Sequence, residues 1–266
     1  MKKISKFILG LCAVMAITSC SDNGASGPAV STDIMVTVTA CDNIDSRAIA
    51  TIEGYELNCV MQLVNDAGAM VGTQTVKPAS GGVVSFTIKA ADIDEGASKA
   101  LFWAEYVPTS GNQKVYNSAD LTNITYNVTT FTNAAQIAAS DAFAGAITTL
   151  TNGASVTLTR PMIQFNFTPN NPEIAQASTS LAVSYTAPSG YNVLTGNCTI
   201  ASVQALNFAN QEFSYNAYPW FTSYIFAPSN MSKLDQPITM TLSGGFEKEF
   251  VIKADEIPSN CSNSEP

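Results

Sequence analysis

Apolar and polar residues alternate along many short segments of this 266-residue chain. In residues 34–40 the apolar side chains fall at every second position, and threonines take most of the positions between them. A repeat of two residues predicts a β-strand with one buried face. We expect that face to be formed by Ile34, Val36, Val38 and Ala40.

Similar segments follow, separated by residues that favour turns. They predict strands at residues 57–64, 83–88, 101–107, 155–159, 162–167, 181–185 and 224–227, and a hairpin around Gly244-Gly245. Residues 133–147 have a helical composition, which Gly145 limits to a short helix. Many short strands with little helix predict an all-β fold of β-sandwich domains. We place one domain at residues 33–157 and a second at residues 158–266.

The first 20 residues follow a different pattern. Lysines precede an apolar run at residues 7–16, which is too short to cross a bilayer as a helix. The run leads into Ile17-Thr18-Ser19-Cys20, which resembles the lipobox of bacterial lipoproteins. The resemblance implies that residues 1–19 are a lipoprotein signal peptide and that Cys20 carries the lipid. An ordinary secretory signal is the alternative.

Residues 20–32 are small and polar and include Gly and Pro, so they predict a flexible tether between the lipid and the first domain. Each buried CH₂ of an acyl chain contributes roughly 0.8 kcal/mol to membrane binding, so several chains on one cysteine anchor firmly. We therefore expect attachment to the outer membrane, with the protein exposed at the cell surface.

Composition narrows the functions that the chain can have. The formal net charge is −9, and only 12% of residues are charged, so nucleic acid is not an expected partner. The chain has no histidine, which excludes Ser-His-Asp and Cys-His catalysis and removes the commonest metal ligand. We expect no enzymatic activity, no cofactor and no metal.

Two other sets of residues contain groups that can bind metals. The acids of Asp92-Ile93-Asp94-Glu95-Gly96 resemble the start of a calcium loop, but Trp103 stands where the last acidic ligand belongs, so a solvated turn is favoured. Cys41, Cys59, Cys198 and Cys261 lack the spacing of a zinc site. A Cys41–Cys59 disulfide and free buried thiols both stay open.

Several features, taken in order, resemble the fimbrillin-type lipoproteins of the Bacteroidota, the type V pilin and fimbrial-anchor group. Besides the lipobox, tether and first strand, they are Ser46-Arg47-Ala48, Trp103-Ala104-Glu105-Tyr106, Tyr116-Asn117-Ser118-Ala119-Asp120-Leu121, Asp141-Ala142-Phe143 and Leu158-Thr159-Arg160-Pro161. The resemblance implies two transthyretin-like β-sandwich domains in tandem and a role in adhesion. It also implies cleavage between Arg47 and Ala48, and partners that are other fimbrial subunits or copies of the same chain.

The resemblance further implies that the first strand is exchanged for a segment of a neighbouring subunit. Burial of Ile34, Val36 and Val38 contributes about 1.5–3 kcal/mol each, so loss of the strand exposes roughly 5–9 kcal/mol of burial. It also leaves unpaired backbone groups beside it, which a strand from another chain can pair by β-augmentation. We expect the strand to lie at an edge of its sheet.

The C-terminal residues 259–266 depart from the family pattern, because they show no alternation where a last apolar strand is expected. A chain without that strand suits an anchor or a cap, or is a truncated product. The stalk, anchor and tip roles therefore stay open.

Aromatic residues suggest an alternative function. Tyr218, Trp220 and Tyr224 lie in or next to a turn-like stretch and are candidates for a platform that stacks on sugar rings of host or bacterial surface ligands. Packing at a domain interface is the competing interpretation. For Trp103, which lies within a predicted strand, we expect packing in the core.

Overall fold

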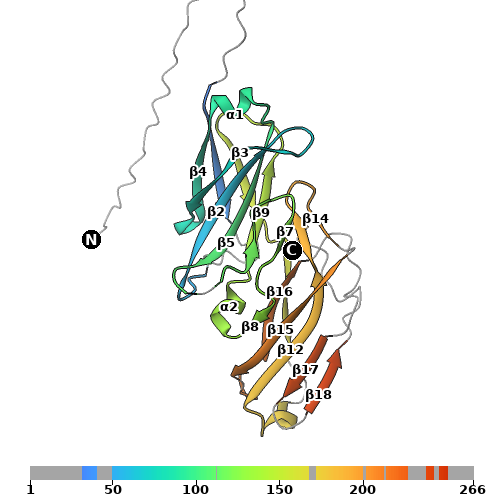
Figure 1. Cartoon of the computed structure of the whole chain (residues 1–266). Helices are drawn as coiled ribbons and strands as arrows, with labels where there is room; N and C mark the ends of the chain where they lie inside the picture. The colour runs from blue at the N-terminus through green and yellow to red at the C-terminus, as the bar shows by residue number, and fades with distance from the viewer. Residues whose placement is uncertain are drawn as a thin grey trace, which may run out of the picture. The chain divides into compact units, whose positions relative to one another are not determined.

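The computed structural model describes residues 32–40, 50–111, 113–167, 172–199, 202–212, 214–226, 238–242 and 246–250. The predicted signal peptide, Cys20, nearly all of the tether, the Arg47–Ala48 bond and the C-terminal residues 259–266 lie outside these residues. The described chain is all-β, as predicted (Figure 1). Its α-helices are short, α1 (Ala90–Asp94) and α2 (Ala134–Ala138), with 3-10 turns at Ser80–Gly82 and Pro172–Ala175. No helix in the described ranges is long and apolar enough to cross a membrane.

The first predicted strand is present as β1 (Ile34–Ala40). It lies between β4 (Val83–Ile88), which runs antiparallel to it, and β10 (Ala154–Leu158), which runs parallel to it. The expectation of an edge strand is therefore wrong, because β1 is the central strand of its sheet. Its pairing joins residues that are more than a hundred positions apart, such as Val36 and Ala154.

A second sheet packs against this one. Its order is β3 (Met70–Pro78), β2 (Tyr55–Val64), β5 (Lys99–Pro108) and β9 (Ala142–Ile147). The rings of Phe86 on β4 and Phe102 on β5 lie 5.7 Å apart, and both side chains are fully buried. The two sheets thus enclose an apolar core, as in a β-sandwich.

The remaining strands form three further sheets. Their orders are β14 (Asn197–Cys198), β13 (Gly190–Asn192), β7 (Ile124–Tyr126), β6 (Tyr116–Asn117); β18 (Phe246–Phe250), β17 (Ile238–Leu242), β12 (Ser180–Pro188), β15 (Val203–Glu212), β8 (Thr130–Phe131); and β11 (Met162–Phe167), β16 (Phe221–Phe226). The segment from β6 to β8 thereby pairs with strands that follow residue 180. The division into domains at residue 158 stays a prediction.

The short helix expected within residues 133–147 is present as α2, and the second half of the segment forms strand β9, which the sequence does not predict. Gly145 shows why the strand is favoured here. A Cβ at this position would lie 2.8 Å from the Leu158 side chain and 3.1 Å from the Val156 side chain on β10, so a larger residue here would require these side chains to move. Tertiary packing between β9 and β10 overrides the local preference of an alanine-rich sequence for helix.

Candidate functional site

The inward face of β1 is apolar and almost completely enclosed. The exposed fractions of Ile34, Val36, Val38 and Ala40 are 9%, 0%, 1% and 7%. Met35, on the opposite face, is exposed. The four residues chosen from the alternation therefore point into the core together, and their exchange stays a prediction.

Polar contacts hold the start of β1. The carboxylate of Asp33 accepts a hydrogen bond from the Ala90 backbone N–H at 2.9 Å. It also forms an ion pair with Lys89, with 2.9 Å between Oδ2 and Nζ. The Ala90 amide, and then Lys89, lower the pKa of Asp33 below its ordinary value. On the other side, the Met35 N–H donates to Asn152 Oδ1 at 2.9 Å. These contacts fix the register of β1 against both neighbours.

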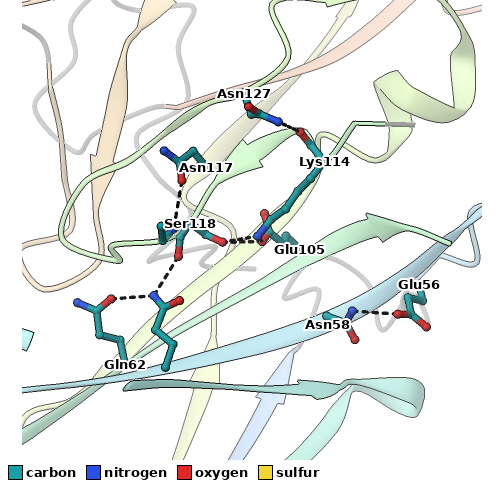
Figure 2. A network of polar contacts seen from close by, with 10 residues as sticks. Glu56, Asn58, Gln62, Glu105, Lys114, Asn117, Ser118 and Asn127 are labelled. Carbon is teal, nitrogen blue, oxygen red and sulfur yellow. Dashed lines mark hydrogen bonds and ion pairs between the residues drawn. The ribbon is translucent and has the colours of Figure 1, made fainter. Parts of the chain in front are cut away.

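A network of polar residues lies on the opposite face of the second sheet (Figure 2). Glu105 on β5 is fully buried, and its Oε1 lies 2.5 Å from Nζ of Lys114. Ser118 Oγ donates to the same oxygen at 2.8 Å and accepts from Lys114 Nζ at 2.6 Å. A lysine and a serine that follow β5 in the chain therefore return to compensate its buried charge.

The network continues across the sheet to β2 and β3. The side-chain oxygen of Gln62 accepts from the Leu121 backbone N–H at 2.8 Å and from Gln74 Nε2 at 2.9 Å. Gln62 also donates to Asp120 Oδ1 at 3.1 Å, and Gln74 donates to the Ser118 carbonyl at 2.9 Å. Residues 114–121, called the covering segment below, are thus tied to three strands of the sheet.

Burial dominates the electrostatics of Glu105. It raises the pKa of the carboxyl above its ordinary value of 4.5, and the ion pair with Lys114 and the Ser118 hydrogen bond only partly offset this effect. The Trp103 indole N–H also lowers this pKa, but at a geometry outside that of a hydrogen bond. Burial therefore destabilises the charged form of Glu105 by more than Lys114 and Ser118 stabilise it.

A cavity of about 390 Å³ lies between this sheet and the covering segment. Its apolar lining comes from Val60, Val76 and Val107, on three adjacent strands. Its polar lining residues are Asn58, Gln74, Glu105, Lys114, Tyr116, Asn117, Ser118 and Asn127. Glu105, Tyr116, Asn117 and Ser118 fall within motifs that carry the family resemblance, but the sequence does not indicate that they share a site.

The proposed aromatic platform is only partly assembled. Trp220 is 8% exposed, donates its indole N–H to the Tyr215 carbonyl at 3.1 Å and packs against Phe167. Trp220 and Tyr224 line a second cavity of about 240 Å³ beside α2, whereas exposed Tyr218 is not among its lining residues. The structure therefore brings two of the three residues together in a hollow and not on an open surface.

Two motifs that the sequence singled out meet in space. Arg160 donates to both carboxylate oxygens of Asp141, Nε to Oδ1 at 2.6 Å and Nη2 to Oδ2 at 2.7 Å. The same guanidinium lies over the rings of Phe143 and Tyr224, at 5.4 and 5.6 Å. This paired arginine therefore has a packing role.

The structure also places the tryptophan, the acidic residues and one of the cysteines that the sequence analysis discusses. Trp103 is fully buried, which confirms core packing. Asp92 and Asp94 lie on α1, and no cluster of potential metal ligands is found among the described residues. Cys59 is a buried free thiol, and burial raises its pKa to about 12.

The arrangement of the sheets defines an all-β protein of β-sandwich type. The chain belongs to a family of unknown function, DUF6562, whose model matches residues 26–258. A search of curated proteins finds no match.

Several solved structures resemble the chain at low sequence identity. A candidate cell adhesion protein from Bacteroides eggerthii is 14% identical, with a TM-score of 0.40, over 86% of this chain and 80% of that chain. Candidate polysaccharide-binding proteins (DUF1812) from Bacteroides thetaiotaomicron are 9% identical, with a TM-score of 0.46, over 81% and 78%. A candidate adhesin from Bacteroides ovatus is 9% identical, with a TM-score of 0.42, over 82% and 75%.

Proposed function

We propose that this protein is a lipid-anchored lipoprotein of the outer-membrane surface that acts in adhesion as a fimbrial subunit, anchor or cap. It joins a neighbouring subunit by exchange of β1 after cleavage at Arg47. The observation that carries the proposal is the position of β1, which buries four apolar side chains and is followed by the segment that contains Arg47. The lipid on Cys20 and the location rest on the sequence pattern.

The central position of β1 increases what its removal exposes. Val84, Phe86 and Ile88 on β4 are buried, and the backbone groups of both β4 and β10 pair with β1. Removal leaves two rows of unpaired groups and an apolar groove between them. An extended segment from another chain that carries apolar residues at alternate positions restores both kinds of contact.

The chain offers few sites to an arginine-specific protease. It contains two arginines, Arg47 and Arg160. The side chain of Arg160 is 16% exposed and is held by Asp141, so its peptide bond is poorly placed for cleavage while the protein is folded. Arg47 is therefore the expected position of cleavage.

The test is assembly after limited cleavage. Purified full-length chain is incubated with an arginine-specific protease, and its mass is followed by size exclusion with light scattering. We expect wild type to be cut after Arg47 and to form oligomers, and Arg47→Ala to stay intact and monomeric. Wild type that is cut and stays monomeric contradicts the proposal.

A cross-link supplies a matched control for strand release. Thr37 on β1 and Ser85 on β4 are directly opposite each other on the outer face of the sheet. A Thr37→Cys/Ser85→Cys variant can form a disulfide that keeps β1 in place after cleavage. We expect the oxidised variant to be cut without assembling and the reduced variant to assemble. Equal assembly in both states would mean that β1 is not exchanged.

Glycan binding is the second candidate, and the hollow lined by Trp220 and Tyr224 favours it. Aromatic rings beside a cavity provide faces for sugar rings. Binding of uncut protein to a glycan array, weakened by Tyr224→Leu, which removes an aromatic face, or by Thr222→Val, would support this function. Binding that is unchanged in both variants would exclude this hollow as the site.

A further inference from the structure

The cavity between the second sheet and the covering segment has the size and lining of a small-molecule site. Its volume of about 390 Å³ lies within the range of about 300–1,000 Å³ that is usual for ligand pockets. Val76 and Val107 provide apolar surface above the buried Val60, and polar side chains converge on the cavity from the sheet and from the covering segment. Ligand pockets typically combine these two kinds of lining.

Two buried oxygens at this cavity lack a partner. Within the described residues, neither Asn58 Oδ1 nor Glu105 Oε2 has a donor at hydrogen-bond geometry, and the Trp103 indole N–H, which lowers the pKa of Glu105, is itself unpaired. Asn58 and Glu105 are directly opposite each other in the pairing of β2 with β5, so the two oxygens belong to neighbouring side chains. Buried polar groups are normally paired, and each group left unpaired costs stability.

The orientation of the Asn58 amide follows from its other contact. Its Nδ2 donates to Glu56 Oε1 at 3.1 Å (Figure 2). A flipped amide would place an oxygen against that carboxylate, and two acceptors do not pair. Asn58 therefore presents an acceptor beside Glu105 Oε2, which has no donor at hydrogen-bond geometry, and a matching ligand must donate a hydrogen bond to Asn58 or to both oxygens.

The charges beside the cavity favour a neutral ligand. Lys114 and Glu105 form an ion pair, so a cation meets the lysine and an anion meets the glutamate. An ammonium group has three donors, and Lys114 directs two of them to Glu105 and Ser118. Its third donor suits a ligand that also accepts a hydrogen bond. A hydroxyl group both donates and accepts.

We propose that this cavity binds a neutral saccharide, with adjacent hydroxyl groups on Asn58, Glu105 and Lys114 and the apolar face of the sugar ring on Val76 and Val107. This site is separate from the aromatic hollow and does not depend on strand exchange. A sugar surface with several C–H groups suits the valines, whereas a small alcohol or an ion leaves them uncovered.

The test uses uncut full-length protein and a set of methyl glycosides of glucose, galactose, mannose and N-acetylglucosamine. Binding is measured by saturation-transfer NMR and by calorimetry. We expect at least one neutral glycoside to bind, and the related glucosamine and glucuronide to bind at least tenfold more weakly because each carries a charge. No binding by any of the four, up to about 50 mM, overturns the proposal, since ~50 mM corresponds to less than 2 kcal/mol of affinity.

Variants locate the bound sugar. Asn58→Leu removes an acceptor at similar volume, and we expect at least tenfold weaker binding. Val76→Trp enlarges a side chain that is 57% exposed, so the fold is retained while access to the cavity is blocked. Thr222→Val, in the other cavity, is the control and keeps full affinity. Binding that survives both Asn58→Leu and Val76→Trp, or is lost only in Thr222→Val, overturns the assignment.

Discussion

The two faces of the second sheet differ sharply, although neighbouring residues of the same strands form both. On β5, Phe102 points to the core that contains β1 and β4, where it meets Phe86. Successive side chains of a strand point to opposite faces, so Trp103 and Glu105 lie on the other face, beneath the covering segment. Both faces bury apolar side chains, and the second face, where Trp103 packs against Tyr116, also carries a charge that needs specific partners.

This difference separates two requirements. An apolar face is satisfied by any side chains of matching shape, which is what an exchanged strand needs from its groove. A polar face is satisfied only when each group finds a partner at the correct distance and angle. The core around β1 is therefore suited to accept a replacement segment, and the cavity at Glu105 is suited to discriminate among ligands.

The largest effect is expected in the apolar core. Phe86→Ala leaves a cavity against Phe102 and should lower the free energy of unfolding by about 3–5 kcal/mol. Val83→Ala, on the exposed face of the same strand, should change it by less than about 0.5 kcal/mol. Urea denaturation measures both. Similar effects of the two substitutions would show that the sheets do not enclose the core described here.

The next effect concerns the buried ion pair. Lys114→Met leaves the Glu105 charge uncompensated and should cost about 2–3 kcal/mol at neutral pH. This is less than for a fully buried pair, because the Lys114 side chain is 34% exposed. Lys99→Met, at a lysine that bonds only a loop carbonyl in the described structure, is the control.

The pH dependence sharpens this prediction. Because the folded-state pKa of Glu105 is raised, its favourable contribution is complete below the unfolded value and is lost as pH rises through the folded value. The deficit of Lys114→Met should therefore shrink as pH falls from neutral toward 4.5, the ordinary value for a glutamate. A deficit that is independent of pH would mean that Lys114 acts by packing alone.

A smaller effect is expected for Ser118→Ala. The hydroxyl donates to the charged Glu105 and accepts from Lys114, and its loss should cost about 1–2 kcal/mol in urea denaturation. Ser118→Cys keeps a weak donor of similar size and should cost less than alanine does. If Ser118→Ala is neutral, the covering segment is held by Gln62 and Gln74 and not by the serine.

The smallest effect is expected at the start of β1. Asp33→Asn removes an exposed ion pair with Lys89, so a small loss of stability that salt screens is expected. The pKa of Asp33 is lowered, so its contribution is present above 3.8 and is lost as pH falls through the folded value. Asp94→Asn, on exposed α1, is the control. Equal effects would show that Asp33 does not hold β1.

The sequence predicts strands whose residues alternate between apolar and polar or form an apolar run, with turn residues on either side. Residues 83–88 and 162–167 match β4 and β11, because each combines alternation with flanking turn residues. Strand β3 was missed because most of its side chains are at least partly exposed, which leaves no apolar face to detect. The sequence does not predict β9, because the fit of this strand against β10 depends on residues distant in sequence.

One candidate site could be predicted from the sequence, and the other could not. The inward residues of β1 could be chosen from local alternation, which is a property of the strand itself. Glu105 was visible as one charge in the apolar run from 101 to 107, but nothing in the sequence joins it to Lys114 or Asn58. Those contacts depend on strand register and on the path of the covering segment, and both are set by the fold.

The mixed pairing of β1 has a consequence for any assembly built through its position. A replacement segment that keeps both sets of backbone bonds must run antiparallel to β4 and parallel to β10, so it enters in one direction only. Under the proposed exchange, each subunit receives a segment between β4 and β10 and donates a segment from a different part of its own chain. Such contacts between unlike surfaces produce an open, polar chain with two different ends when the rotation does not close.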